Sequence, residues 1–578
     1  MSMNNKQISS LLNQLADLME LKGENPFKAN AYRRAARAVE NSRKPLDELE
    51  KGPEELPGVG KGTAQAIREI METGRLETLD RLLKELPAGL PGLMSIPGLG
   101  PKSIHLLYHK LGITDIGNLE EALKQGRVRG LPGFGEKKEK NILEGIRRMK
   151  ERPRRYLLIH VLPVAETLKE RLAKHPDVER VEAAGSLRRM TETVKDIDLV
   201  VATEKPSSVA ESIVSMPEVT EVINHGETKV SVMIHRGFDI QVDVRLVPPD
   251  RFITALHHFT GSKEHNVRIR QRAKERGWRV SEYGIHDPER GEVFTFSGEE
   301  EMYRKLDLPF IAPEMREDRG EMDKKPDELP RLLKTGDYRG DLHMHTRWSD
   351  GTASVRDMAL AARERGYEYI AITDHSHSLK VASGLTPDDL KRQREEIDAV
   401  NEELDGITVL AGTEMDILPD GSLDFPDEVL EELDLVIASV HSGFRQDGKT
   451  LTRRILNALE NPHVHILAHP TGRLINRRDP YEVDLDRIFE AARKTKTILE
   501  LNSNPNRLDL KDLHLKRAKE EYGLHFSINT DAHSPEMLDF IRLGIATARR
   551  GWLEADDVIN TFSLDRLRKR LDEIKQHK

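Results

Sequence analysis

The strongest constraint on the fold is a repeated pattern in residues 341–578. Short apolar runs typical of β-strands alternate there with helix-like stretches, and each run ends in a histidine or an acidic residue, as in YIAITDHS, LVIASVHS and HILAHP. Barrels of alternating strands and helices carry their functional groups at the C-terminal ends of the strands. The pattern therefore predicts an (α/β) distorted barrel with a site at its strand ends.

The residues that end these runs are of the types that bind metal ions. In DLHMHTRWSD, side-chain alternation along a strand puts His343 and His345 on one face. The further candidates are Asp350, His375, Glu414, His441, His469, Asp531 and His533. A single histidine is more often an ordinary surface or core residue, but a set of this size indicates a metal site. Because the chain has no cysteine, the ligands are nitrogen and oxygen, which suit Mn²⁺, Zn²⁺ or Fe²⁺.

A second group of carboxylates lies in the middle of the chain. The motif GSLRR, residues 185–189, precedes Asp196 and Asp198 in a strand-like run, and Asp243 lies in the later run QVDVRLV. Carboxylates at i and i+2 of a strand point the same way, and a third from a neighbouring strand can complete a cage for two hard cations. We expect these three acids to be catalytic and to hold two Mg²⁺ or Mn²⁺ ions for an in-line phosphoryl displacement.

Three similar glycine loops punctuate a helical N-terminal region. Each has the form apolar-Pro-Gly-apolar-Gly, at residues 56–60, 96–100 and 131–135, and each precedes a lysine-bearing helix. Such loops at a helix N-terminus present backbone N–H groups to a phosphate without reading base sequence. The candidate DNA-binding residues are Gly58, Gly60, Lys61, Gly98, Gly100, Lys102, Gly133, Gly135 and Lys137. The loops are also candidates for holding a monovalent cation. None of them fits the GxxxxGK[ST] loop of an ATPase.

The charge distribution agrees with a phosphate-binding N-terminal region and a metal-binding C-terminal region. Residues 1–150 carry 25 Lys and Arg against 20 Asp and Glu, whereas residues 341–578 carry 33 against 44. The N-terminal region is therefore the better candidate for phosphate contact, although solvated surfaces alone could produce both values. No long uncharged apolar run and no signal pattern is present, so we expect a cytoplasmic protein without membrane contact.

The motifs of the first 317 residues resemble DNA polymerase beta and its family X relatives. GSLRR, DID and VDVRL are similar to that family's palm, Asn30-Ala31-Tyr32-Arg33 to its small N-terminal domain, and Phe259-Thr260-Gly261-Ser262 to its nucleotide pocket. The three loops resemble helix-hairpin-helix motifs. The resemblance implies binding of dNTPs and of gapped or primed DNA. The nucleotide-binding residues it implies are Gly185, Ser186, Arg189, His258, Phe259, Gly261, Asn266 and Arg270.

Two positions depart from that family. His258 stands where the eukaryotic enzyme has a tyrosine, which leaves sugar discrimination open. Ala66 stands where the family's lyase has its Schiff-base lysine, and a methyl group cannot replace an amine nucleophile. We therefore expect little lyase activity through Ala66; Lys28 or Lys61 are alternative amines.

Residues 341–578 resemble the polymerase-and-histidinol-phosphatase (PHP) domain, a metal-dependent phosphoesterase. The resemblance implies up to three Mn²⁺ or Zn²⁺ ions. Its ligand sets are His343, His345, Glu414 and Asp531 for the first ion, Glu414, His441 and His469 for the second, and Asp350, His375 and His533 for the third.

The complete prediction is a multi-domain chain. The expected segments are helical residues 1–85, a helix-hairpin-helix subdomain at 86–152, an α/β nucleotidyltransferase palm at 153–247, a dNTP- and template-binding subdomain at 248–317, a linker at 318–340 and the PHP barrel at 341–578. The expected function is gap-filling repair synthesis with 3′–5′ exonuclease and, as bacterial members imply, cleavage at abasic sites. A small-molecule histidinol-phosphate phosphatase and a non-catalytic DNA-end scaffold are the alternatives. The sequence indicates no protein partner.

Overall fold

The computed structural model describes residues 5–40, 46, 49, 52–87, 89–96, 99–151 and 155–578. The chain forms two compact units, residues 1–154 and 155–578. Each unit has its own hydrophobic cores. None of the helices in these described ranges is both long and apolar enough to cross a membrane.

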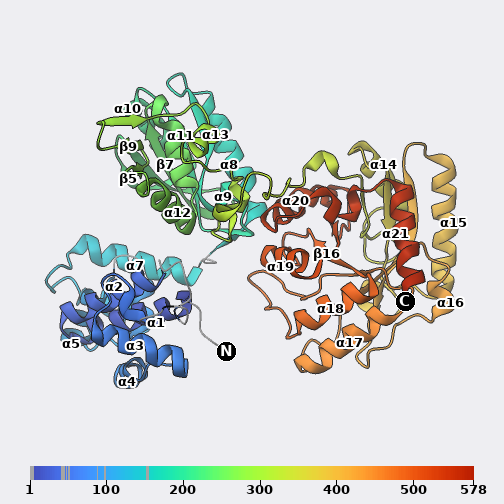
Figure 1. The fold of residues 1–578 in the computed structure, drawn as a ribbon, viewed down its shortest axis with the longest axis horizontal. Coiled ribbons are helices and arrows are strands. Elements are labelled where there is room, and N and C mark those ends of the chain that lie inside the picture. Colours follow the sequence, from blue (N-terminus) through green and yellow to red (C-terminus); the bar gives the residue numbers. More distant parts are fainter. Residues whose placement is uncertain are drawn as a thin grey trace. The chain divides into compact units, whose positions relative to one another are not determined.

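The first unit is all-helical, as its 3.6-residue apolar periodicity predicts (Figure 1). Its α-helices are α1 Asn5–Lys22, α2 Pro26–Glu40, α3 Lys61–Thr73, α4 Glu77–Glu85, α5 Pro101–Leu111, α6 Ile116–Lys124 and α7 Glu136–Glu151. The helices α3, α5 and α7 follow the three glycine loops. Gly60 and Gly100 are the N-caps of α3 and α5. Each loop therefore leads directly into a helix N-terminus.

The second unit begins with a five-stranded sheet of order β2-β4-β7-β6-β5. Its strands are β2 Arg180–Ala183, β4 Asp196–Ala202, β5 Val219–His225, β6 Lys229–His235 and β7 Asp239–Val247. The helices α8 Leu158–Ala173 and α10 Pro206–Val214 pack on this sheet, and α11 Phe252–Thr260 packs on β4. The residues Ile197, Leu199 and Val201 of β4 belong to the core that includes α8 and α10. The alternate residues of β4 therefore face the side of α11.

A small subdomain follows the palm sheet. It contains α11, α12 Lys263–Lys274, the antiparallel strands β8 Arg279–Ser281, β9 Gly284–Asp287 and β10 Glu292–Phe294, and α13 Glu299–Lys305. The segment 318–340, expected as a linker, is well packed: Glu321 and Leu333 are fully buried. The Glu321 carboxylate lies 2.9 Å from Nδ1 of His265 in α12, and Leu333 belongs to the core of the C-terminal half. The segment thus contacts both halves of this unit.

The C-terminal half is built on seven parallel strands in sequence order, β11 to β17. The strands are β11 Gly340–Asp341, β12 Tyr369–Ile372, β13 Thr408–Asp416, β14 Leu435–Ser439, β15 Ile466–Leu467, β16 Ile498–Asn502 and β17 Phe526–Asn529. An isolated bridge between Met344 and Ala532 links the two edges, so the barrel is nearly closed.

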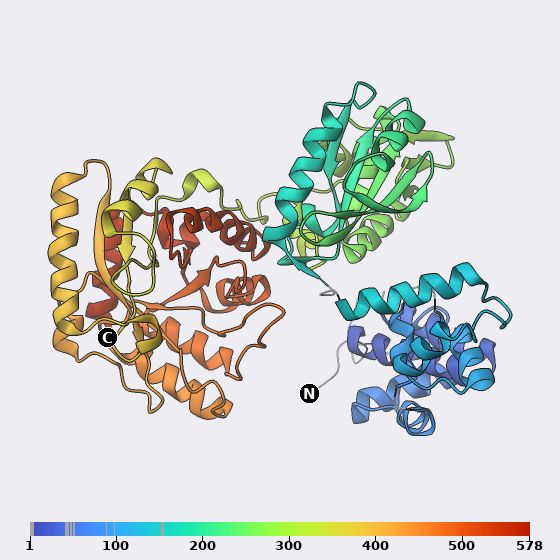
Figure 2. The same ribbon diagram turned by 180° about the vertical axis from the view of Figure 1, so that it is seen from behind.

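Helices surround these strands (Figures 1 and 2). They are α14 Val355–Glu364, α15 Pro387–Glu403, α16 Asp427–Leu430, α17 Gly448–Glu460, α18 Leu485–Thr495, α19 Asp512–Tyr522, α20 Ile541–Arg550 and α21 Leu564–His577. The (α/β) barrel expected for these residues is therefore confirmed.

Candidate functional site

Three acids of the palm lie on one face of its sheet. Asp196 and Asp198 are alternate residues at the start of β4, and Asp243 of the parallel strand β7 is in register with Asp198. Burial raises the pKa of Asp198 to about 7, and repulsion from Asp196 and Asp243 adds to this rise. Bound cations would remove that repulsion. The donor chemistry therefore fits divalent metal ions.

Asp243 is partly neutralised by protein groups. Nζ of Lys229 donates to it at 3.0 Å and the amide of Gln241 donates at 3.0 Å. Burial raises the pKa of Asp243, but these contacts and that with Ser231 outweigh it and hold the pKa below its usual value. The carboxylate oxygens of Asp196, Asp198 and Asp243 do not all lie within 4.8 Å of one another. The three palm acids are therefore spaced more widely than the C-terminal candidates, and Lys229 lies against one oxygen of Asp243.

Gly185 lies against Asp198, and Arg189 follows it four residues later. Gly185 has a φ of +59°, and a Cβ added there would lie 2.1 Å from Oδ2 of Asp198. Only glycine, which has no Cβ, leaves room for the Asp198 carboxylate at this position. Nη1 of Arg189 donates to the carbonyl of Thr260 at 2.5 Å, so Arg189 contacts the C-terminal end of α11. Ser186 lies between these residues, on the short helix α9 Gly185–Arg188.

The remaining nucleotide-pocket candidates cluster around the end of α11. The guanidinium of Arg245 lies 4.5 Å above the ring of Phe259, and the amide of Asn266 donates to the carbonyl of His258 at 2.7 Å. Gly261 has a φ of +68°, and a Cβ there would lie 3.2 Å from Nη1 of Arg189. Arg270 is exposed on α12. The structure thus brings Arg189, Phe259, Gly261 and Asn266 into one region.

The described glycines of the three loops leave their backbones uncovered. Gly58 and Gly133 have φ values of +86° and +78°, which favour glycine. A Cβ added at Gly58, Gly60, Gly100, Gly133 or Gly135 would meet no atom within 4 Å. Lys61, Lys102 and Lys137 are exposed in the first turns of α3, α5 and α7. Gly98 lies outside the described residues. Ala66 is 6% exposed in the core of this unit.

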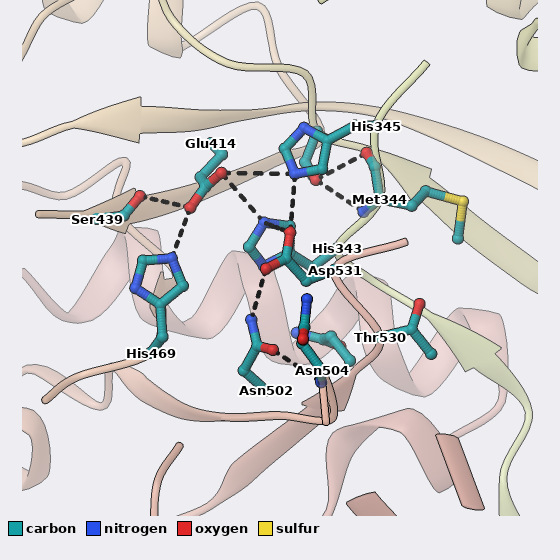
Figure 3. A network of polar contacts seen from close by, with 12 residues as sticks. His343, Met344, His345, Glu414, Ser439, His469, Asn502, Asn504, Thr530 and Asp531 are labelled. Carbon is teal, nitrogen blue, oxygen red and sulfur yellow. Dashed lines mark hydrogen bonds and ion pairs between the residues drawn. The ribbon is translucent and has the colours of Figure 1, made fainter. Parts of the chain in front are cut away.

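The nine C-terminal candidates form one cluster at the strand ends. Glu414, on β13, is its centre, and Figure 3 shows it between His345 and His469. Its Oε1 lies 2.9 Å from Nε2 of His469 and 3.2 Å from Nε2 of His441. Its Oε2 lies 3.3 Å from Nε2 of His343 and 3.0 Å from Nδ1 of His375. One buried carboxylate therefore faces two groups of imidazoles.

Acids complete the other sides of this cluster. Oδ1 of Asp531 lies 3.2 Å from Nε2 of His345, while Oδ1 of Asp350 lies 3.3 Å from Nε2 of His533 and 3.7 Å from Nε2 of His375. Three overlapping sets bring their ligand atoms within 4.8 Å of one another: His345, Asp350, His375 and His533; His343, His345 and Glu414; His375, Glu414 and His441. In these groups Glu414, His345 and His375 each occur twice, whereas the resemblance implies Glu414 alone as a shared ligand.

The donor set fits divalent cations. Nδ1 of His345 is buried without a hydrogen-bond partner, and Nε2 of His343 and Nδ1 of His375 lie close to Oε2 of Glu414 without forming a hydrogen bond to it. Burial raises the pKa of Glu414, but His441, His343 and His375 outweigh it and hold this pKa well below its usual value. Buried imidazole nitrogens around an ionised carboxylate are the arrangement that a metal ion satisfies.

Two further carboxylates orient the imidazoles and were missed in the sequence analysis. Oε1 of Glu500, on β16, lies 2.6 Å from Nδ1 of His343, and Oδ1 of Asp416, on β13, lies 2.5 Å from Nδ1 of His441. Such contacts fix the ring orientation of a metal-binding histidine. Asp416 could have been found, because it is two residues after Glu414 and faces the same side of β13. No comparable spacing relates Glu500 to His343.

Comparisons with known proteins match several parts of the chain and, for one relative, nearly all of it. Residues 3–76 match a helix-hairpin-helix domain, 91–148 a SAM-like helix-hairpin-helix tandem, 255–317 the DNA polymerase beta thumb and 341–504 the PHP domain. A DNA polymerase/3′-5′ exonuclease PolX of Bacillus subtilis (strain 168) is 49% identical over 562 residues, which cover 97% of this chain and 98% of that protein.

Other relatives match a shorter part of the chain. A probable phosphatase of Thermoanaerobacter sp. (strain X514) is 27% identical over 232 residues, 38% of this chain and 89% of that protein. A probable phosphatase of Acetivibrio thermocellus is 34% identical over 169 residues, 28% of this chain and 65% of that protein. Because the B. subtilis protein instead matches over nearly the whole length of both chains, the chain belongs to the family X DNA polymerases that carry a C-terminal PHP domain.

Proposed function

We propose that this protein is a DNA polymerase that fills gaps during DNA repair and trims 3′ ends with its PHP domain. The observation that carries the proposal is the presence, in one chain, of a palm carboxylate group and a separate set of buried histidines and acids. The full-length similarity to a DNA polymerase/3′-5′ exonuclease supports the pairing of these two chemistries.

At the palm, Asp196, Asp198 and Asp243 would hold two Mg²⁺ or Mn²⁺ ions. Such ions activate a primer 3′-hydroxyl and stabilise the leaving pyrophosphate. Arg189 and the N–H groups after Gly185 would bind the triphosphate of a dNTP. The thumb residues Phe259 and Asn266 would contact its sugar and base. Nζ of Lys229 donates to Asp243 at 3.0 Å and partly balances its charge.

At the PHP site, the histidines and acids around Glu414 would hold up to three Mn²⁺ or Zn²⁺ ions. Such ions supply an activated water and stabilise the charge on a phosphodiester. Glu500 and Asp416 orient His343 and His441 for this role. We extend the proposal to phosphodiester cleavage at abasic sites, since this reaction needs the same chemistry. The glycine loops would hold gapped or primed DNA by its phosphates, with a monovalent cation as a further ligand.

One assay tests the proposed function. Purified protein is incubated with a labelled gapped duplex and Mn²⁺, with and without dNTPs. We expect extension into the gap with dNTPs and 3′ shortening without them. Protein that hydrolyses small phosphate monoesters but leaves the duplex unchanged would instead be a small-molecule phosphatase, and binding without either reaction would indicate a scaffold.

A further inference from the structure

An arginine of the PHP half lies against the nucleotide-binding region of the palm. Arg550 is the last residue of α20, and its side chain is 8% exposed. Its Nη1 donates to the backbone carbonyl of Arg189 at 2.8 Å and to Oε1 of Glu317 at 2.9 Å. Both partners belong to the polymerase half of the second unit.

Glu317 links the two arginines. The same oxygen, Oε1, accepts from Nε of Arg189 at 3.0 Å. The Glu317 side chain is 17% exposed and that of Arg189 is 14% exposed, so water screens this contact only partly. Burial raises the pKa of Glu317, but Arg550 and Arg189 outweigh it and keep the carboxyl ionised. Glu317 therefore has two positive partners in the present arrangement.

Arg550 is itself held within the PHP half. Oδ2 of Asp512 accepts from its Nε at 3.0 Å and lies 2.9 Å from its Nη2. The same oxygen accepts from both Nη1 and Nη2 of Arg319 at 3.1 Å. These contacts fix the Arg550 guanidinium in one orientation, with Nη1 directed at Glu317 and the Arg189 carbonyl.

We propose that Arg550 is a positioning residue through which the PHP domain controls dNTP binding at the palm. The inference rests on the proposed polymerase function and on triphosphate binding by Arg189. Arg550 balances much of the negative charge of Glu317. Glu317 therefore positions Arg189 but competes only weakly with a triphosphate for the Arg189 guanidinium. Without Arg550, the Glu317 carboxylate has Arg189 as its remaining cationic partner, and an incoming triphosphate must compete with it.

Steady-state single-nucleotide gap filling by the full-length protein tests this role. Arg550→Gln should raise the KM for dNTP about tenfold, as expected for an altered charge-assisted contact, and leave kcat within about twofold. Adding Glu317→Gln should bring KM back toward the wild-type value, because the competing carboxylate is gone. Arg550→Lys, which keeps the charge and a donor, should stay close to wild type.

The matched control is Asn476→Ala. Asn476 belongs to the PHP half and donates to the backbone carbonyl of Arg155 at 2.9 Å, a contact that involves neither Arg189 nor Glu317. This variant should leave KM unchanged. An unchanged KM in Arg550→Gln, a KM that stays high in the double variant, or an equal rise in Asn476→Ala would each overturn the inference. If the wild-type protein itself adds no nucleotide, the proposed function fails, which is a distinct result.

Discussion

Gly185 lies where the palm backbone approaches Asp198. Its φ of +59° and the 2.1 Å approach of an added Cβ to Oδ2 of Asp198 leave no room for a side chain. We expect Gly185→Ala to move Asp198 and lower dNTP incorporation by at least about tenfold, since small displacements of reacting groups have large effects. Gly237→Ala is the control, because Gly237 also has a positive φ, of +77°, but open space around its Cβ. Equal incorporation by the two variants would contradict this account of Gly185.

A substitution of Glu500 tests the contacts that orient the proposed metal ligands of the PHP site. Glu500→Gln weakens the contact with Nδ1 of His343 without removing a direct ligand. Loss of such a contact lowers metal affinity or activity about 10–100-fold. We expect lower bound metal by elemental analysis and slower 3′ shortening, with dNTP incorporation unchanged. Glu403→Gln is the same chemical change at an exposed ion pair with Arg356 and should have no effect on either measurement.

Site residues that lie two positions apart on one strand could be predicted from the sequence. His343 and His345 alternate along one strand, and Asp196 and Asp198 do the same, so the side of the sheet that they share follows from geometry. Residues that act across strands could not be found in this way. Glu500 approaches His343 from a distant part of the chain, because the barrel brings β16 beside the first strand-end histidines.

The three loop-and-helix elements of the first unit should bind DNA through phosphates. Their backbones are uncovered, and Lys61, Lys102 and Lys137 are exposed beside them. Affinity should therefore be insensitive to base sequence and should fall with salt, with a slope of about 0.9 per neutralised phosphate in duplex DNA. Each Lys→Gln change should lower that slope by about one. Fluorescence anisotropy with two unrelated duplexes over a KCl series measures both properties, and a strong sequence preference would overturn the prediction.

The strands and helices of the molecule were largely predictable because their apolar periodicity is regular. The segment 318–340 was harder, since its charged composition is typical of a solvated connector. In the structure these charges have specific partners: Glu321 lies against His265, and Arg319 contacts Asp512 of α19. Composition indicates how polar a segment is, but not whether tertiary contacts satisfy its charges.

At the scale of the whole molecule, two metal-dependent chemistries are built on separate frameworks. The palm acids are held by β4 and β7 of one sheet, whereas the proposed PHP ligands are held at the strand ends of a barrel. Their ligand residues are distinct, so each set should be removable without loss of the other. The link through Arg550 and Glu317 connects the PHP half to nucleotide binding and not to the palm acids themselves.

The central claim is tested most directly by assaying two variants on one labelled gapped duplex. Asp198→Ala should lower dNTP incorporation by at least about 100-fold, since even outer contacts of a metal site contribute about 10–100-fold, and should leave 3′ shortening intact. His343→Ala combined with His345→Ala should abolish 3′ shortening while incorporation continues. The account is contradicted if folded, DNA-bound Asp198→Ala loses both activities, or if the double histidine variant still shortens 3′ ends at the wild-type rate.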